Sequence, residues 1–543
     1  MKQSDYSGRN GNLFSRRRLT EELKATQVWD VIVIGGGATG LGVALDGVSR
    51  NYKVLLLEQD DFGKGTSSKS TKLVHGGVRY LAQGDIDLVR EALFERGLLL
   101  KNAPHLVRNR TFIIPNYDLL RGPFYWIGLK LYDLLAGKWS LGPSQYISRA
   151  EVIKRIPTIE KSGLRNGVSY HDGQFDDARM AVNLAQTVIE KGGCALNHFP
   201  VGGLLKNKDG KIIGVQAWDK ETGEKFEITG KAVVNATGVF VNQIIEMDDQ
   251  HKPPLVRPSQ GAHIVLDRSF LNSEEAMMIP KTSDGRVLFA VPWHNRVIVG
   301  TTDMPVSQAE LDPRPLQEEI DYILETAGRY LTRPPQHSDV LSVFAGLRPL
   351  AAHQSDDDTK TKEISRSHRI ITDKSGLVTI TGGKWTTFRK MGEDVIDRVV
   401  TVAQLPPRPS TSQNIKIHGA LEQMPGKGET PDLYGTDRKI IKELIQEDPK
   451  LVERLHPEMD FTLAEVVLAV RNEMARTIED VLARRVRLLF LDAAAAITCA
   501  PVVADILARE LGKDEIWKNQ EVERFRIFAE GYLLSKMKFP IND

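Results

Sequence analysis

The stretch Asp30-Val-Ile-Val-Ile-Gly-Gly-Gly-Ala-Thr-Gly40, with Lys53-Val-Leu-Leu-Leu-Glu58 behind it, decides the fold. Both apolar runs are short and continuous, which is typical of strands buried on both faces of a parallel sheet. The glycine pattern Gly35-x-Gly37-x-x-Gly40 directly follows the first predicted strand and opens a predicted helix. This order of strand, glycine turn, helix and strand predicts a Rossmann-type α/β unit that binds a dinucleotide.

Each part of this unit has a physical task. Gly35 permits the tight turn, Gly37 lets the backbone approach a pyrophosphate, and Gly40 lets the helix pack close to the strand. The helix begins near Ala38-Thr39, where N–H groups and the positive end of the helix dipole attract an anion. Glu58 can accept hydrogen bonds from ribose hydroxyls and would repel a 2′-phosphate, which argues against an NADP-type cofactor.

Three further segments favour FAD over NAD. The run Thr66–Leu73 is rich in hydroxyls and suits a long, phosphate-bearing cofactor, and Asn235–Gly238 ends a buried strand, well placed to close over the adenine half. Thr381–Thr387 is another glycine turn before a helix, whose N-terminus can face flavin carbonyls, where negative charge gathers on reduction. No second Gly-x-Gly-x-x-Gly occurs in a comparable context, so we expect one FAD per chain.

Length and composition limit the class of protein. A chain of 543 residues is expected to form two or three packed units, and its formal charge of +1 gives no broad attraction for nucleic acid. Cys194 and Cys499 are too few for an iron–sulfur cluster or a disulfide framework, which indicates a reducing compartment and an organic redox cofactor. We expect no metal site. No apolar run reaches the roughly 18–20 residues that span a bilayer.

The chain divides into four predicted regions. Residues 1–28 are polar and are expected to form a flexible leader, because no apolar stretch follows the arginines as a signal peptide requires. Residues 29–403 are expected to contain the FAD-binding domain and an interleaved substrate-binding domain. Residues 404–430 are rich in Pro, Gly and Ser and indicate a linker or surface wrap. Residues 431–543 are predicted to form a helical C-terminal domain.

Periodicity within these regions predicts individual elements. A helix is expected near residues 178–191, strands near 202–218, and an antiparallel sheet over 255–303, where apolar and polar residues alternate. A further strand is expected within 376–383. In the C-terminal domain, residues 463–489 and 492–511 carry apolar residues near helical period.

Seven motifs, in order over about residues 29–400, carry a resemblance to a known family. They are Val31–Gly40, Thr66–Leu81, Pro104–Leu106, Asn235–Gly238, Gly300–Asp303, Ala345–Leu350 and Thr381–Thr387. The chain resembles the FAD-dependent, respiratory glycerol-3-phosphate dehydrogenases, and the stretch His75-Gly-Gly-Val-Arg-Tyr80 is the most discriminating. The resemblance implies a Rossmann-like FAD domain of the glutathione-reductase and D-amino-acid-oxidase type, an antiparallel-sheet substrate domain and an all-α C-terminal domain. It also implies oxidation of sn-glycerol 3-phosphate to dihydroxyacetone phosphate, with electrons passing to a membrane quinone.

The motifs together give the expected FAD-binding residues. These are Gly35, Gly37, Ala38, Thr39, Gly40, Glu58, Thr66, Ser67, Ser68, Ser70, Lys72, Leu73, Gly238, Gly346, Gly383, Lys384 and Thr386. Two departures from the family pattern bear on function. The C-terminus lacks the acidic Ca²⁺-loop pattern of mitochondrial members, and the interval from Arg348 to Lys384 lacks the long insertion of the peroxide-forming oxidases. The sequence therefore favours a dehydrogenase without calcium control.

Oxidation of a secondary alcohol needs a base within hydrogen-bond reach of the hydroxyl. Histidine suits this task at neutral pH. The candidates are His75, beside the hydroxyl-rich loop, and His263, at the start of a predicted strand. We favour His75 as the base, so its replacement by Gln should abolish flavin reduction while FAD stays bound.

The substrate phosphate needs cationic donors, and arginine offers a two-pronged fork for it. The candidates are Arg348, Arg366, Lys384 and Arg79 with Tyr80, and His263 is expected at the same substrate site. Arg348 is also counted among the catalytic residues. Lys384 has an alternative role, because its charge could stabilise the reduced flavin.

The segment Phe124–Trp139 is rich in Trp and Tyr and poor in charge. It is too short to span a bilayer but suits an interfacial element, and a buried core helix is the alternative. Because a quinone acceptor requires contact with lipid, we expect a peripheral protein on the cytoplasmic face of the membrane. A homodimer is a further expectation.

Three other functions remain open from the sequence. A glycerol-3-phosphate oxidase would pass electrons to O₂ and release H₂O₂. An amine or amino-acid oxidase on the same fold would ignore phosphorylated glycerol. A flavin-containing binding module would show no turnover, and bleaching of its flavin by glycerol 3-phosphate would exclude it.

Overall fold

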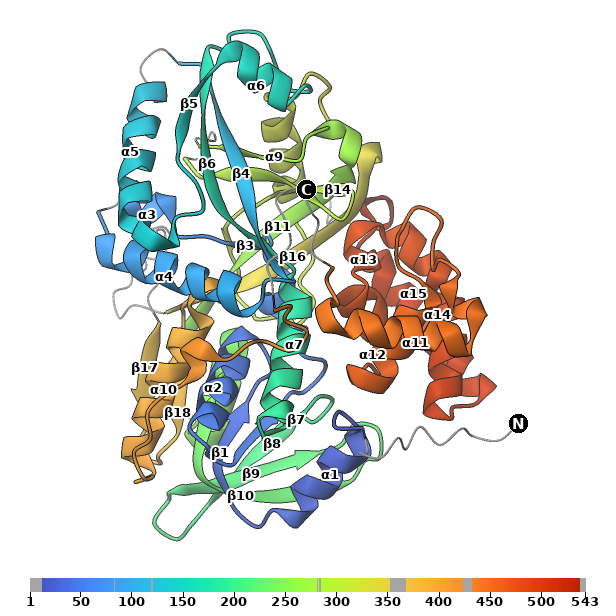
Figure 1. Cartoon of the computed structure of the whole chain (residues 1–543). Helices are drawn as coiled ribbons and strands as arrows, with labels where there is room; N and C mark the ends of the chain where they lie inside the picture. Colours follow the sequence, from blue (N-terminus) through green and yellow to red (C-terminus); the bar gives the residue numbers. More distant parts are fainter. Residues whose placement is uncertain are drawn as a thin grey trace, which may run out of the picture.

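The computed structural model describes residues 12–82, 84–118, 121–280, 282, 285–351, 368–422 and 432–537. Two sheet-containing parts lie one above the other along the long axis, and a group of helices lies beside their junction (Figure 1). The mixed α/β architecture with a helical C-terminal part confirms the predicted fold class.

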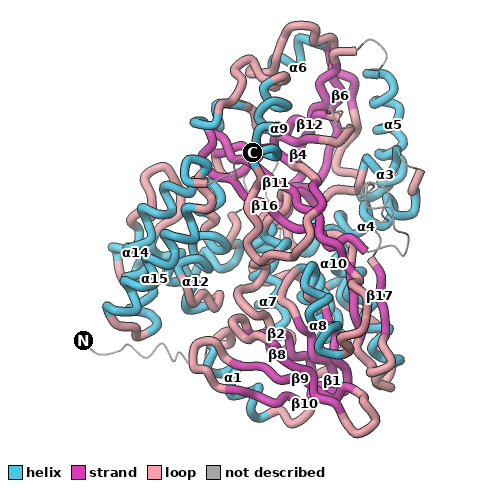
Figure 2. The backbone as a smooth tube through the Cα atoms, turned by 180° about the vertical axis from the view of Figure 1, so that it is seen from behind, coloured by secondary structure: helices cyan, strands magenta, loops and turns pink. Residues whose placement is uncertain are grey.

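The first sheet carries the glycine turn. Its strands are β1 (Trp29–Ile34), β2 (Val54–Leu57), β7 (Cys194–Leu196), β8 (Val201–Lys206), β9 (Ile212–Trp218), β10 (Lys225–Asn235), β17 (Arg369–Thr372) and β18 (Val378–Thr381). They follow the order β17-β18-β10-β1-β2-β7, and β1 pairs in parallel with β2 and β10. Strands β8 and β9 extend β10 in antiparallel fashion at the lower end of the molecule (Figure 2). The side chains of Val31, Ile32 and Val33 are fully buried, as expected for a strand covered on both faces.

Helices α2 (Ala38–Ser49), α7 (Asp177–Glu190) and α10 (Phe388–Val402) pack on this sheet. Helices α2 and α10 cross at two glycines. A Cβ atom on Gly392 would lie 2.2 Å from the carbonyl oxygen of Gly42, so only glycine allows this approach. The crossing ties the glycine turn that precedes α10 to the one that precedes α2.

The second sheet is longer and mostly antiparallel. Its strands are β3 (Leu73–Val74), β4 (Val107–Asn116), β5 (Gln145–Ser148), β6 (Asn166–Phe175), β11 (Val256–Asp267), β12 (Ala276–Ile279), β13 (Leu288–Trp293), β14 (Arg296–Gly300), β15 (Met304–Pro305) and β16 (Val340–Ala351). The main order is β15-β11-β14-β13-β12-β4-β6-β3, with β16 on β11 and β5 on β6. The antiparallel pairs β11–β14, β13–β14 and β12–β13 confirm the sheet predicted over 255–303.

Further helices accompany this sheet and its connections. They are α3 (Val78–Ala82), α4 (Ile86–Asn102), α5 (Arg121–Ala136), α6 (Arg149–Arg155), α8 (Val241–Asp248) and α9 (Gln317–Gly328). Helix α5 lies at an outer edge, away from the helical part (Figure 1). In the described part of the chain, every helix is too short or too polar to cross a membrane.

The helical part contains α11 (Arg438–Glu447), α12 (Leu463–Asn472), the π-helical turn η11 (Asp480–Arg485), α13 (Leu488–Leu491), α14 (Ala493–Leu511) and α15 (Glu515–Glu530). Residues 463–489, which carry apolar residues near helical period, are divided among α12, η11 and the start of α13 and do not form one continuous helix. Helix α12 ends at Asn472, and the fully buried carboxylate of Glu473 pairs with Arg179 of α7. The break allows this ion pair with α7, which packs on the first sheet.

The predicted flexible leader is wrong for residues 12–28. Residues 16–25 form helix α1 (Arg16–Ala25), whose Leu19 and Leu23 are buried in the core of the first sheet. Arg16 donates to Asp219 and to the backbone of Asn197, which holds the helix against the sheet edge. One apolar stripe and one paired arginine are enough to anchor a helix that is otherwise polar.

The described part of the predicted linker, residues 404–422, lies against helices α2 and α4. Ser412 donates to the buried carboxylate of Asp46, and Asn102 donates to the backbone of Gln413. Residues 423–430 lie outside the described residues.

Candidate active site

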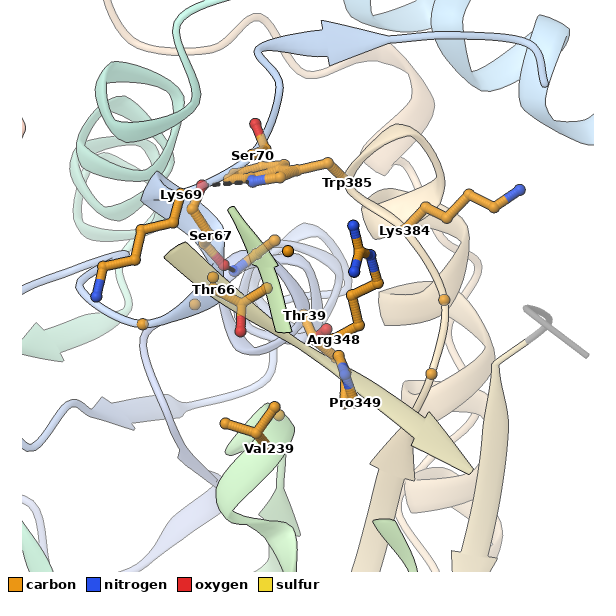
Figure 3. Close-up of a pocket in the computed structure, with 18 of the residues that line it drawn as sticks. Thr39, Thr66, Ser67, Lys69, Ser70, Val239, Arg348, Pro349, Lys384 and Trp385 are labelled. Atoms are coloured by element: carbon orange, nitrogen blue, oxygen red, sulfur yellow. Dashed lines mark hydrogen bonds between the residues drawn. The ribbon is translucent and has the colours of Figure 1, made fainter. Parts of the chain in front are cut away.

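A cavity of about 490 Å³ lies between the two sheets. Its walls come from strand ends of the first sheet, from β3, β4, β6, β11, β12, β13 and β16 of the second, and from the loops after β2 and β18. Figure 3 shows Arg348 of β16 reaching toward the loop of Lys384 and Trp385, with Ser67 and Ser70 across from it. Segments distant in sequence therefore meet in one enclosed space.

The glycine turn has the geometry that the motif predicts. Gly35 has a φ of 108°, and a Cβ atom there would lie 2.7 Å from the carbonyl oxygen of Ala236. A Cβ atom on Gly40 would lie 1.9 Å from the carbonyl oxygen of Gly35, so helix α2 can begin this close only with glycine. Helix α2 has no side-chain cap at Gly37, and its first turn faces the cavity.

Glu58 lies beside this turn, at the end of β2. Its carboxylate accepts hydrogen bonds from the backbone N–H of Gly36 at 2.6 Å and of Asp60 at 2.9 Å. Burial outweighs these bonds and raises the pKa of Glu58 to about 7. The acid is thus placed to accept hydrogen bonds at the cavity wall, as a ribose-binding residue requires.

The hydroxyl-rich loop and the last glycine turn contact each other. Ser67 Oγ accepts from the backbone N–H of Ala38 at 2.9 Å, and Trp385 Nε1 donates to the carbonyl of Ser67 at 2.8 Å (Figure 3). Thr66 Oγ1 donates to the carbonyl of Leu347, which joins the loop to β16. These bonds hold the segments predicted for the cofactor around a single space.

These features fit a flavin dinucleotide. A diphosphate needs a helix N-terminus that it can approach without a Cβ atom in the way, and the glycine turn supplies one. Among the described residues, no group of three or more His, Cys, Asp or Glu side chains could hold a metal ion.

His263 is fully buried and lies in the cavity wall on β11. Its Nε2 lies 2.9 Å from Thr71 Oγ1, and its ring stacks on Phe344 at 4.8 Å. Its Nδ1 has no hydrogen-bond partner among the described residues. Burial, and next the charges of Lys72 and Arg348, keep the pKa of His263 well below its ordinary value, so the ring is neutral at neutral pH.

His75 also lines the cavity and is half-buried. Its backbone carbonyl accepts from Thr386 Oγ1 at 3.4 Å. This contact joins the two glycine-containing loops, so both predicted histidines face the same space.

Arg348 stands on β16 with its guanidinium against the neighbouring strand and loop. Nη2 donates to the carbonyl of Thr302 at 2.8 Å, and Nη1 lies 3.3 Å from Asp303 Oδ1. A Cβ atom on Gly261 would lie 2.4 Å from Nη2, so β11 leaves room for the guanidinium only through glycine. Lys384 lies nearby in the same cavity, with its Nζ 3.5 Å from the ring centroid of Tyr80.

Most sequence-predicted residues lie in the cavity wall. They are Gly35, Gly37, Ala38, Thr39, Glu58, Thr66, Ser67, Ser70, Leu73, His75, Tyr80, Gly238, His263, Gly346, Arg348, Gly383, Lys384 and Thr386. Gly40 lies behind the turn. Ser68 and Lys72 lie beneath the wall, because Lys72 is fully buried in an ion pair with Asp177. The side chain of Arg79 and the whole of Arg366 lie outside the described residues.

Sequence reasoning missed several residues of the wall. Thr71 was passed over within its motif, although it contacts His263. Arg286 lines the cavity, and Phe112, Tyr170 and Met278 form its apolar end. These apolar residues carry the same alternation as other core strands, so nothing in the sequence separates them.

Comparison with protein families covers most of the chain. The family described as FAD-dependent oxidoreductase matches residues 30–389, and the family described as the C-terminal domain of alpha-glycerophosphate oxidase matches residues 431–518.

Similar proteins carry consistent names. A probable mitochondrial glycerol-3-phosphate dehydrogenase of Caenorhabditis elegans is 39% identical over 95% of this chain and 75% of its own length. A mitochondrial glycerol-3-phosphate dehydrogenase of Arabidopsis thaliana is 39% identical over 94% of this chain and 87% of its own length. The crystal structure of the Bacillus halodurans glycerol-3-phosphate dehydrogenase, complexed with FAD, has a TM-score of 0.75 at 26% identity and covers 96% of this chain and 98% of that one.

Proposed function

Because the chain belongs to the FAD-dependent glycerol-3-phosphate dehydrogenase family, we propose that it oxidises sn-glycerol 3-phosphate to dihydroxyacetone phosphate and delivers the electrons to a membrane quinone. The observation that carries this proposal is the meeting of the glycine turn, His263 and Arg348 in one enclosed cavity. Bound FAD would supply the acceptor for the hydride of the carbinol carbon.

His263 is proposed to take the hydroxyl proton. Its ring is neutral, and its Nδ1 has no hydrogen-bond partner among the described residues, so Nδ1 keeps an unshared lone pair if Nε2–H donates to Thr71. The sequence favoured His75 for this role. We place His263 ahead of it, because the imidazole of His263 is held in the cavity wall by Thr71 and Phe344.

Arg348 is proposed to bind the substrate phosphate, with Lys384 as a second cation. The carbonyl of Thr302 and the carboxylate of Asp303 orient the guanidinium before substrate arrives. Because its orientation is already fixed, Arg348 loses little rotamer entropy when it binds, so its ion pair with the substrate phosphate contributes more to affinity.

Anaerobic mixing of the FAD-loaded protein with glycerol 3-phosphate tests the activity directly. We expect the yellow absorbance of the flavin to bleach, and to return when a soluble quinone is added. A flavin that stays oxidised would refute the dehydrogenase. Fast return of the colour with air and release of H₂O₂ would instead identify an oxidase.

Two matched variants separate the histidines. His263→Gln is expected to slow single-turnover bleaching by a factor of about 10²–10⁴, the usual contribution of a general base, with FAD still bound. His75→Gln is expected to slow it less. The reverse order would return the base to His75.

The membrane association rests on helix α5. Phe124, Ile127 and Leu134 are 69%, 63% and 76% exposed along this helix, whereas Leu129 and Tyr132 face the core at 2% each. An apolar face exposed over three turns suits the interface between lipid headgroups and acyl chains. Flotation of the purified protein with liposomes of anionic lipid is the expected result. A protein that stays at the bottom of the gradient would count against a quinone in the bilayer as acceptor.

A further inference from the structure

Two buried cations lie directly beneath the cavity wall, at residues with no part in the proposed reaction. Lys72 ends the turn that carries Ser68, Ser70 and Thr71, and Arg487 comes from the helical part of the chain. Both side chains are 0% exposed. Both residues have left-handed backbones, with φ of 63° and 62°, a conformation that costs a residue with a Cβ atom free energy.

The two cations share the same partners. Lys72 Nζ lies 2.7 Å from Asp177 Oδ2 and 2.7 Å from the carbonyl oxygen of Ser68. Arg487 Nη2 lies 3.0 Å from Asp177 Oδ1 and 3.0 Å from the same carbonyl. Three aromatic rings enclose the pair: those of Trp293, Phe344 and Phe490 lie 5.2 to 5.6 Å from Lys72 Nζ. Because water is excluded, each contact is stronger than on the surface.

Asp177 fixes the turn on both sides of Thr71. Its Oδ2 accepts from the backbone N–H of Ser70 at 3.1 Å and from Ser70 Oγ at 2.7 Å. The backbone N–H of Lys72 in turn donates to Ser70 Oγ at 3.0 Å. The position of Thr71 therefore depends on one carboxylate that Lys72 and Arg487 hold in place.

Thr71 transmits this arrangement to the cavity. Its hydroxyl lies 2.9 Å from His263 Nε2. The ring of Phe344 stacks on His263, and its centroid also lies 5.2 Å from the Lys72 ammonium. The imidazole is thus held by a hydroxyl and a ring that both belong to the buried cluster.

We propose that Lys72 and Arg487 are positioning residues for His263: they hold the turn so that Thr71 fixes the imidazole ring, and the helical part of the chain thereby takes part in setting the site. The inference rests on the proposed role of His263 as proton acceptor. A base acts only within hydrogen-bond reach and in the right orientation, so a small shift of the ring is expected to slow the reaction.

Single-turnover flavin reduction in Arg487→Met, Thr71→Val and the double variant tests the proposal. We expect each single change to lower the rate at saturating glycerol 3-phosphate tenfold or more, with the KM within about threefold and the FAD content unchanged. Because both changes act through one hydrogen bond, the double variant should be no slower than the slower single variant. Wild-type rates in Arg487→Met, or losses that multiply in the double variant, would overturn it.

A control and two conservative variants exclude a general loss of structure. Arg179→Met removes a guanidinium that is as buried as that of Arg487, with 1% of its side chain exposed. The pair of Arg179 with Glu473 also joins α7 to the helical part, but in the described part of the chain neither residue forms a hydrogen bond or ion pair with residues 68–72. Arg179→Met is expected to keep the wild-type rate. Thr71→Ser and Arg487→Lys keep the hydroxyl and the charge and should recover much of the rate. If neither recovers activity in folded protein, the proposal fails.

The pH profile gives a readout that a structural role alone would not move. Burial is the largest cause of the lowered pKa of His263. The charged groups that face the ring, Lys72 from the turn and Arg348 from β16, lower this pKa further. Lys72→Met should therefore raise that pKa, so the acid limb of the reduction rate shifts to higher pH. An unmoved limb in folded Lys72→Met would contradict the role of Lys72.

The outcomes also separate this inference from the function it rests on. Wild-type reduction by His263→Gln would refute the base itself. Slow reduction by His263→Gln together with normal reduction by Thr71→Val would refute only the positioning.

Discussion

Arg348 is a half-buried arginine whose guanidinium is oriented by groups on two segments, strand β11 and residues 301–303. Its Nη1 donates to the carbonyl of Gln260 at 3.2 Å and Nη2 to the carbonyl of Thr302 at 2.8 Å, while its side chain keeps 25% of its surface exposed toward the cavity. The fixed orientation suits recognition of a dianionic phosphate by a planar fork.

Arg348→Ala is expected to raise the KM for glycerol 3-phosphate by tenfold or more, a change of about 1.4 kcal/mol in binding. Steady-state reduction of a soluble quinone measures it. Arg348→Lys should recover little, since lysine offers no fork. The exposed Arg257 on the neighbouring strand β11 is the control, and its replacement by Ala should leave the KM unchanged. A wild-type KM in Arg348→Ala would refute the assignment.

Single residues also mark the limit of inference from sequence. The motif placed Lys72 among the cofactor ligands because its neighbours carry hydroxyls. The structure buries it against Asp177 and Arg487, which are far along the chain. A lysine in a polar loop carries no sign of a distant carboxylate, so only the three-dimensional structure shows its partner.

At the scale of elements, helix α5 presents two faces with different surroundings. Replacing Phe124, Ile127 and Leu134 together by Ser should lower the partition onto anionic liposomes at least about a hundredfold, since each buried side chain of this size contributes about 1.5–3 kcal/mol. Flotation measures the partition. The same change should leave the melting temperature nearly unaltered, because these side chains lie outside the core.

The matched control lies on helix α15. Ile516 and Ile527 are 66% and 60% exposed there, and their replacement by Ser should not change flotation. Equal losses for both helices would show that binding to the vesicles does not depend on α5.

Elements coded by local pattern were predictable, and those held by distant contacts were not. The unit from β1 to β2 follows from its glycines and its apolar runs, and β11 to β14 follow from alternation. Helix α1 was missed because it is anchored by only two buried leucines, Leu19 and Leu23, and by the contacts of Arg16 with residues far along the chain. The break after Asn472 was missed because the ion pair that accompanies it joins Glu473 to Arg179, which is far away in sequence. The periodicity of a local stretch carries no information on contacts with residues that are far away in sequence.

At the scale of the whole molecule, a buried ion cluster joins the helical part to the FAD domain. Asp61, in the loop after β2 and 0% exposed, accepts from Arg484 Nε at 2.5 Å and from Arg485 Nη1 at 2.6 Å. Both arginines belong to η11. Removing the carboxylate leaves two buried guanidinium groups with fewer partners, which is costly in a dry interface.

Asp61→Ala is therefore expected to lower the free energy of unfolding by about 3–5 kcal/mol. Urea denaturation followed by circular dichroism measures it at pH 7. The arginines hold the pKa of Asp61 below its ordinary value. The stabilisation from the Asp61 ion pairs is therefore fully present above the pKa that Asp61 has in the unfolded chain, and it is lost as the pH falls through the pKa of the folded state. The difference in free energy of unfolding between the wild type and Asp61→Ala should therefore become smaller below about pH 4. Asp505→Ala, which removes a 62% exposed carboxylate, should cost less than about 0.5 kcal/mol.

The central place of β1 has a consequence for biosynthesis. This strand leaves the ribosome among the first, yet its neighbour β10 and the closing turn after β18 belong to much later stretches of the polypeptide. At about 5–20 residues per second, translation leaves the nascent strand without its second neighbour for on the order of ten seconds or more. A newly made chain must therefore protect this apolar strand from aggregation for that time, and it can retain the coenzyme only after the turn that follows β18 has been made.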